Sequence, residues 1–242
     1  VAREYNRPVE PFAFREEHKD GAAARPAASA PVRVGLAEEI ITAPVGAPMA
    51  GYARKGVSTG VHDDLYARSL TIESSDGTPV VMMPLGIIHF GFDNLEKMRA
   101  KIQAATGISP DNVIVSCTHT HSGPDPGGAG PAYIDLVIER AAKSAIDAWT
   151  KRVPGRIGTG STTVLELGRN DRRMEYGGLH ADPEVGLIKV EDARGRLLGV
   201  LFNYGCHPST LNLYNLEFTE DWPHYTIQQI KRDFGPNVWA AF

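Results

Sequence analysis

Two histidines separated by one residue, His119 and His121, follow an apolar run over residues 113–117 that is rich in β-branched side chains. Side chains at positions i and i+2 of an extended chain leave the same face, so we expect both imidazoles to point together from the end of a strand. His207 also follows an apolar stretch and precedes a proline. Imidazole is a good zinc ligand and carries protons near neutral pH. Three histidines at strand ends therefore favour a hydrolytic metal site with an activated water. The alternative is a set of ordinary packed or surface histidines.

Two other kinds of H-x-H site fit the sequence poorly. A metallo-β-lactamase site needs the pattern H-x-H-x-D-H, whereas Ser122, Gly123 and Pro124 follow His121. An amidohydrolase barrel has its H-x-H at the end of the first strand, whereas we expect at least three strands before this one. Neither class accounts for the histidines of this chain.

The elements that must position the histidines alternate between strands and helices. Hydrophobic patterns predict strands over residues 32–36, 66–73, 79–85, 113–117, 155–167, 186–191, 197–204 and 238–242. Capping residues and a period of 3.6 predict helices from Asp93 as N-cap to about residue 105, from Pro131 to about residue 149, and from Asp221 as N-cap to Gly235. Strand, helix and buried strand in succession over residues 79–117 favour a parallel βαβ unit. The sequence thus predicts an α/β protein with mixed β-sheets, packed helices in βαβ-type units and a metal site at strand ends.

Composition indicates an ordinary globular protein. The chain has 242 residues, of which 42% are hydrophobic and 22% charged, so it can bury a sizeable core in one domain. A net charge of −4 gives no electrostatic reason to expect nucleic acid as a partner. Cys117 and Cys206 each lie close to a histidine. We favour two small buried free thiols near the site, with a disulfide or a thiolate ligand as alternatives.

Four blocks of sequence resemble the neutral (non-lysosomal) ceramidase family. The most specific is Thr-His-Thr-His-Ser-Gly-Pro over residues 118–124. The blocks keep the family's order and spacing from about residue 32 to residue 242. The other three lie at residues 41–44 with 48–52, at 60–68 and at 203–209. The chain is thus similar to the N-terminal portion of that family's catalytic domain.

The resemblance implies a zinc-dependent hydrolase that cleaves an N-acyl amide by attack of a metal-activated water on the carbonyl. It implies that His119 and His207 are zinc ligands. His121 would lie on the substrate side, where it would bind substrate or move a proton, although it could instead orient the loop. Ceramide is the family's substrate, but a smaller non-lipid amide or an ester would suit the same centre.

The family's Asn-Arg segment corresponds to residues 170–173. An arginine there, best matched by Arg172, would stabilise an oxyanion or a bound polar group, with an ordinary surface charge as the alternative. We expect His62 and Asp63 to brace a loop. The remaining histidines are taken as ordinary residues: His18, His89, His180 and His224.

The sequence also departs from the family pattern. Asp171 interrupts the Asn-Arg segment, and the family's other zinc ligands, a glutamate and a tyrosine, come from a later part of the chain. Because these ligands are missing, we expect residues 31–242 to form a catalytic domain that is incomplete at Phe242. Residues 1–30 are rich in Ala, Pro, Arg and Glu and offer little to bury, so we expect them to form a poorly structured arm or linker. Either a second chain carries the C-terminal half of the site, or the chain simply stops there. A homo-oligomer is left open, and a secreted or periplasmic location is slightly favoured over a cytoplasmic one.

A rival from another class is a binding or assembly subunit that keeps the fold and has lost the chemistry. Metal content separates the two, because an enzyme of this kind needs its ion and an inactive module does not.

Overall fold

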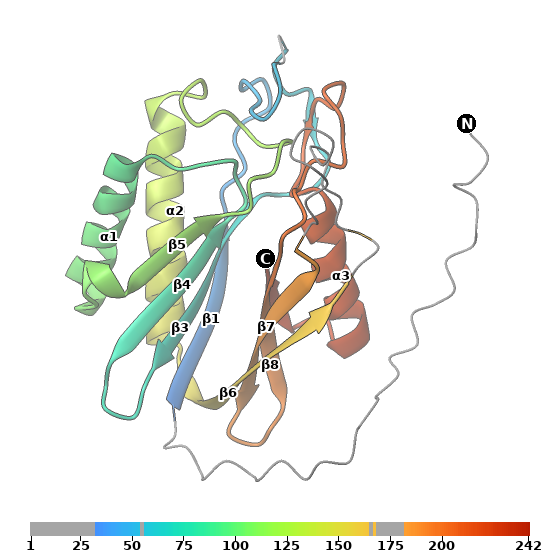
Figure 1. The fold of residues 1–242 in the computed structure, drawn as a ribbon. Helices are drawn as coiled ribbons and strands as arrows, with labels where there is room; N and C mark the ends of the chain where they lie inside the picture. Colours follow the sequence, from blue (N-terminus) through green and yellow to red (C-terminus); the bar gives the residue numbers. More distant parts are fainter. Residues whose placement is uncertain (1–31, 54–55, 165–166, 168–181) are drawn as a thin grey trace.

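The computed structural model describes residues 32–53, 56–164, 167 and 182–242. Ten strands and three α-helices form in this part of the chain (Figure 1). The strands are β1 Val32–Ile40, β2 Gly60–Val61, β3 Tyr66–Glu73, β4 Pro79–Leu85, β5 Val113–Cys117, β6 Val153–Thr163, β7 Glu184–Asp192, β8 Leu197–Tyr204, β9 Glu217–Phe218 and β10 Trp239–Ala241. The helices are α1 Phe92–Thr106, α2 Pro131–Thr150 and α3 Trp222–Phe234, and a 3₁₀ turn spans Pro110–Asn112. None of these helices is long and apolar enough to cross a membrane.

Eight strands form one mixed sheet in the order β10-β8-β7-β6-β1-β3-β4-β5, and β2 and β9 form a second, two-stranded sheet. Strand β4 pairs with β5 in parallel, with α1 between them in sequence, as the βαβ prediction requires. Strands β7 and β8 form the predicted antiparallel hairpin. The large sheet thus contains both parallel and antiparallel pairs, and its α/β class is confirmed.

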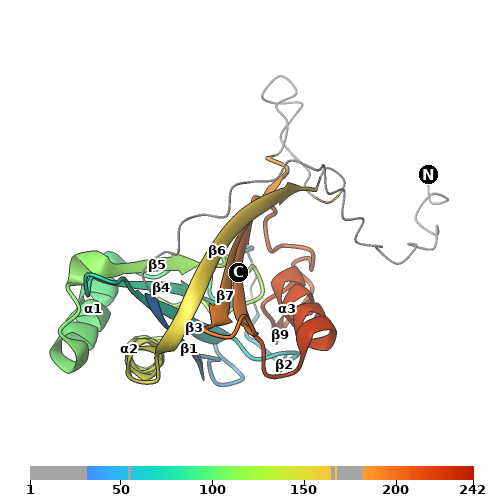
Figure 2. The ribbon, with the colours of Figure 1, turned by 90° about the horizontal axis from the view of Figure 1, so that it is seen from below.

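The large sheet bends between β1 and β6, which share three residue pairs (Figure 2). Trp239 on β10 donates a hydrogen bond from Nε1 to the carbonyl oxygen of Ala37 on β1, at 3.1 Å. Three other strands separate β10 from β1 in the sheet order, so this contact requires a strongly curved sheet. Apolar side chains of β1, β3, β7 and β10 pack together inside the curve.

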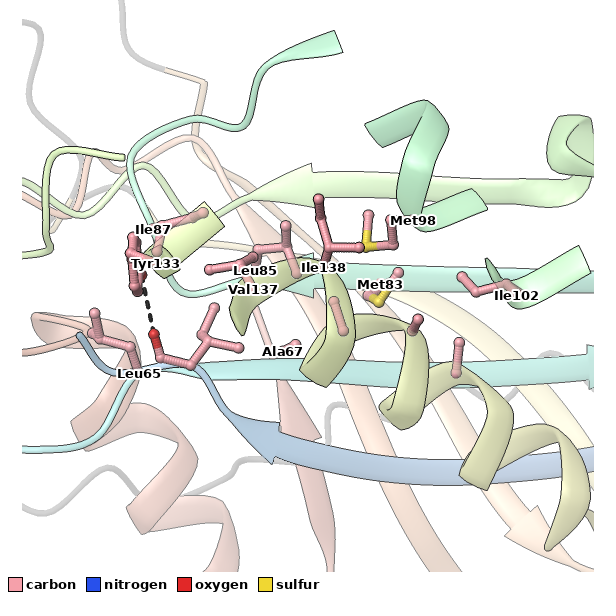
Figure 3. Close-up of a cluster of buried hydrophobic side chains, with 14 of the residues drawn as sticks. Leu65, Ala67, Met83, Leu85, Ile87, Met98, Ile102, Tyr133, Val137 and Ile138 are labelled. Carbon is pink, nitrogen blue, oxygen red and sulfur yellow. Dashed lines mark hydrogen bonds between the residues drawn. The ribbon is translucent and has the colours of Figure 1, made fainter. Parts of the chain in front are cut away.

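Helices α1 and α2 cover one face of strands β1, β3, β4 and β5 (Figures 1 and 2). Helix α3 packs against β8 and β10, at the opposite end of the strand order from β5. The main core forms under α1 and α2 from fully buried residues such as Leu85, Met98 and Val137 (Figure 3). Tyr133 anchors the start of α2, because its buried hydroxyl donates to the carbonyl oxygen of Ile41 at 3.0 Å. That bond fixes the beginning of the loop that follows β1.

Two details of the predicted elements were wrong. Gly91, not Asp93, is the N-cap of α1, and Asp93 lies in the first turn, where its charge still complements the helix dipole. Strand β5 is only half buried: Val113 faces the core under α1, whereas Ile114 points the other way and is 52% exposed. The reason is that β5 lies at an edge of the described sheet, with helices packed on one face. The predicted arm over residues 1–30 lies outside the described residues.

Candidate active site

Three histidines converge where the segments after β5 and β8 meet. His119 and His121 follow β5, His207 follows β8, and the backbone N–H of His121 donates to the carbonyl oxygen of Pro208 at 3.0 Å. One possible ligand atom from each of the three rings lies within 4.8 Å of the other two. The structure therefore brings together the three histidines that the sequence places at strand ends.

His119 is fixed by both its backbone and its ring. Its φ is 64°, a left-handed conformation that side chains with a Cβ rarely adopt. Its Nδ1 lies 2.6 Å from the carbonyl oxygen of Ile88, which requires Nδ1 to carry the proton. In the neutral ring such a bond places the lone pair on Nε2, which is the arrangement typical of metal-bound histidine. The ring centroids of His119 and His121 are 5.5 Å apart, so the two imidazoles lie close together as expected. The left-handed turn at His119 brings them together, whereas the sequence predicted an extended chain.

His121 and His207 are in direct contact. Their Nε2 atoms are 2.9 Å apart, and the ring centroids are 4.4 Å apart in an edge-on arrangement. Partial removal from water lowers the pKa of His207, and His119 lowers it further, while Asp221 acts in the opposite direction. His207 is therefore neutral at neutral pH, the state that a metal ligand requires.

Gly51 and Tyr52 pack against His121. A Cβ on Gly51 would lie 2.5 Å from the Cα of His121, and Gly51 has a φ of 97°, so glycine is needed for this close approach. The ring of Tyr52 meets the ring of His121 edge-on at 4.8 Å. The long irregular loop after β1 thus forms one wall of the site.

A cavity of about 280 Å³ lies beside the histidines. It is lined by residues 116–119 on one side and residues 203–208 with Phe242 on the other. Two larger cavities, of about 470 and 510 Å³, lie elsewhere, and no described histidine or cysteine lines either of them. We assign the chemistry to the smaller cavity, because His119 and His207 line it.

Both cysteines line the same cavity and are free thiols. Burial raises the pKa of Cys117 to about 12, so this thiol stays protonated at neutral pH. Burial also raises the pKa of Cys206. The structure thus favours two packed thiols over a disulfide, and neither thiol joins the histidine cluster.

The other sequence candidates have mixed outcomes. Arg172 lies outside the described residues and stays a prediction. Asp63 is buried and accepts hydrogen bonds from His62 Nδ1 and from the backbone N–H of Glu220, each at 2.9 Å. The two residues were expected to brace a loop, and these bonds join the segment after β2 to the residues that lead into α3. Sequence reasoning missed the contact of Tyr52 with His121, although Tyr52 stands inside a block that carries the family resemblance.

No protein-family model matches the chain. Its sequence is 26% identical to a neutral ceramidase of Drosophila pseudoobscura pseudoobscura, over 87% of this chain and 33% of that protein. It is 25% identical to a neutral ceramidase of Pseudomonas aeruginosa, over 84% of this chain and 34% of that protein. The chain thus spans about a third of the length of the curated relatives that it matches.

Solved structures show the same fold. The crystal structure of neutral ceramidase from Pseudomonas aeruginosa matches with a TM-score of 0.79 and 22% identity, over 87% of this chain and 38% of that one. A ceramidase complexed with C2 matches with a TM-score of 0.78 and 23% identity, over 87% of this chain and 37% of that one. Over most of its own length, the chain is therefore similar to the neutral ceramidases in sequence and shares the fold of a solved one, as its motifs predict.

Proposed function

We propose that this chain carries part of the active site of a zinc-dependent hydrolase that cleaves the amide bond of an N-acylated lipid of the ceramide type. The observation that carries the proposal is the convergence of His119, His121 and His207, with ligand atoms within 4.8 Å of one another, in a chain similar to neutral ceramidases. The curated relatives are named neutral ceramidases, which is why we propose a ceramide-type substrate. The histidines would bind the metal ion that the reaction needs.

The residues present fit a zinc ion. His119 and His207 are the ligands in this proposal: the first has Nδ1 held by a carbonyl oxygen, and the second is neutral at neutral pH and faces the cavity. Nitrogen ligands of this kind are those that zinc prefers. A zinc ion at such a site supplies a nucleophile at neutral pH, because it lowers the pKa of a bound water.

The chain's other residues act on the substrate. His121, in contact with His207, takes a proton from the attacking water and delivers one to the leaving amine nitrogen. Arg172 stabilises the negative charge that develops on the carbonyl oxygen. Both roles come from the family resemblance, and for His121 the contact geometry adds support.

The proposal includes further ligands from outside this chain, because the chain spans about a third of its relatives. They come from a later part of the same protein or from a second chain that carries the C-terminal half of the site. Intact mass and N-terminal sequencing of every polypeptide in the preparation separate these cases: two co-purifying polypeptides support the second, and a single longer polypeptide supports the first.

The activity test uses the full-length protein with ceramides of graded acyl length and a short N-acyl amide. We expect hydrolysis that is abolished by a zinc chelator and restored by added zinc, with longer acyl chains preferred. A His89→Ala variant is the matched control, because His89 is exposed and outside the cluster. Hydrolysis that survives the chelator, or that is absent from the zinc-loaded protein for every amide, would refute the proposal.

A further inference from the structure

Among the described residues other than glycine, His119 and Asp221 have a positive φ, of 64° in each case. Asp221 combines this φ with a ψ of −148°, close to a region of backbone space that is occupied almost entirely by glycine. A residue held in such a conformation persists only when the surrounding structure over-determines it, and such residues cluster at functional sites. For His119 the side chain is a candidate metal ligand. For Asp221 the side chain is a carboxylate that accepts hydrogen bonds from neighbouring residues.

The carboxylate of Asp221 is buried and binds two segments at once. Its Oδ1 accepts from the backbone N–H of Trp222 at 2.7 Å, which caps α3 as the sequence predicts. Oδ1 also accepts from the hydroxyl of Thr210 at 2.7 Å and from its N–H at 3.2 Å, and Oδ2 accepts from the N–H of Leu211 at 3.2 Å. Capping alone does not explain an aspartate here, because glycine caps a helix almost as well and would adopt this backbone without strain. The contacts to Thr210 and Leu211 are what glycine would lose.

Tyr52 holds the same loop from the other side. Its hydroxyl lies 3.2 Å from the carbonyl oxygen of Ser209 and 3.0 Å from that of Leu211, so its one proton is shared between them. Its ring meets His121 edge-on. The loop over residues 207–211, which begins with His207, is therefore fastened to α3 by Asp221 and to the H-x-H segment by Tyr52.

We propose that Asp221 and Tyr52 are positioning residues that hold the 207–211 loop so that His207 meets His119 and His121 at metal-binding distance. The inference rests on the proposed function only in taking these histidines as a metal site. Neither residue touches the metal or the substrate in this scheme. They act through the backbone that carries His207.

The test measures binding of Co²⁺, a spectroscopic substitute for zinc, to the full-length protein and to Asp221→Gly, Asp221→Asn and Tyr52→Phe variants. We expect Asp221→Gly to bind about 10- to 100-fold more weakly, with a changed visible spectrum, as is typical when a residue that orients a metal ligand is lost. Asp221→Asn keeps an oxygen acceptor for Thr210, so its affinity for Co²⁺ should fall by less than that of Asp221→Gly. Tyr52→Phe removes one oxygen atom and should weaken binding by roughly 10-fold.

Tyr214→Phe is the control, because Tyr214 is 81% exposed on the segment that follows the same loop and its ring makes no described contact with the histidines. Circular dichroism shows whether each variant is folded, and Tyr52→Phe carries the test if Asp221→Gly does not fold. Binding within twofold of the wild type in both Asp221→Gly and Tyr52→Phe, or no Co²⁺ binding by the wild type, would overturn the inference. A wild type that binds Co²⁺ through this loop and cleaves no amide would instead refute the proposed function and leave the inference standing.

Discussion

At the scale of single residues, the three histidines are not equivalent. His119 has one ring nitrogen committed to the carbonyl oxygen of Ile88 and a strained backbone, so it is presented in a single orientation. His121 lies between His207 and the ring of Tyr52, where a proton on Nε2 would be shared with His207. A rigid nitrogen suits a metal ligand, and a nitrogen that exchanges a proton suits acid–base catalysis. The family resemblance assigns the first role to His119 and the second to His121, and this division stays a prediction because His207 makes the same Nε2 contact as His121.

That division predicts a specific phenotype for His121→Gln. We expect kcat for amide hydrolysis to fall by about 10²- to 10⁴-fold, the usual contribution of a general acid–base residue, while zinc content stays at the wild-type level. Kinetics and elemental analysis on the same sample check this, with His89→Gln as the control. Loss of zinc in parallel with activity would mean that His121 is a third ligand.

At the scale of elements, the loop between β1 and β2 owes its position to contacts and not to regular structure. It forms isolated bridges between Pro48 and Val57 and between Met49 and Pro124. Ala50 N–H donates to the carbonyl oxygen of Gly123 at 3.0 Å, which brings the loop against the H-x-H segment. Gly51 then makes the close approach to His121. The loop therefore shapes the site through its backbone.

Two glycines of this loop give a matched test. Gly46 and Gly51 both have a φ of 97°, but a Cβ on Gly46 would meet nothing within 4 Å, whereas one on Gly51 would meet His121. Each alanine substitution should lower the free energy of unfolding by about 1–2 kcal/mol, because alanine disfavours the left-handed backbone conformation. Only Gly51→Ala should also weaken metal binding and hydrolysis. Equal metal affinity in the two variants would show that the contact with His121 is unimportant.

A buried ion pair joins β3 to the segment that leads into α3. Arg68 Nη1 donates to both carboxylate oxygens of Glu220, at 2.6 and 2.8 Å, and Glu220 is fully buried. Gly86 leaves the space for it, because a Cβ there would lie 2.4 Å from Glu220 Oε1. Glu220 directly precedes Asp221, so the pair fixes the start of α3 and, with it, the loop that holds His207.

Removing one partner of this pair should be costly. We expect Glu220→Gln to lower the free energy of unfolding by about 3–5 kcal/mol, because the buried Arg68 would keep only Glu38, a partly exposed carboxylate 3.2 Å from its Nε, as a counter-charge. The double substitution Arg68→Met with Glu220→Leu should lower it by less than Glu220→Gln does, since both fully buried charges are removed and Glu38, which remains, is partly exposed to water. Urea denaturation of the single and double variants measures both values. A Glu220→Gln variant within 1 kcal/mol of the wild type would contradict this account.

At the scale of the whole molecule, local patterns predicted more than long-range contacts did. The bounds of β3 and β4 and the start of α2 at Pro131 follow from alternation and from proline at the first helical turn, and the structure has them where expected. The bend of the sheet and the contact of Trp239 with Ala37 depend on residues about 200 positions apart, which no local pattern encodes. The same holds for the site: the strand-end histidines were visible in the sequence, but the contacts of Tyr52 and Asp221 with the 207–211 loop were not.

The central claim is that His119 and His207 hold a zinc ion, and metal content tests it most directly. Elemental analysis of the full-length protein, purified without added metal, should find close to one zinc per molecule attributable to this site. The His119→Ala, His207→Ala double variant should lose that zinc while keeping the wild-type circular dichroism spectrum, and His89→Ala should retain it. Zinc that persists in the folded double variant, or a folded wild-type protein that takes up no zinc even when it is supplied, would contradict the claim.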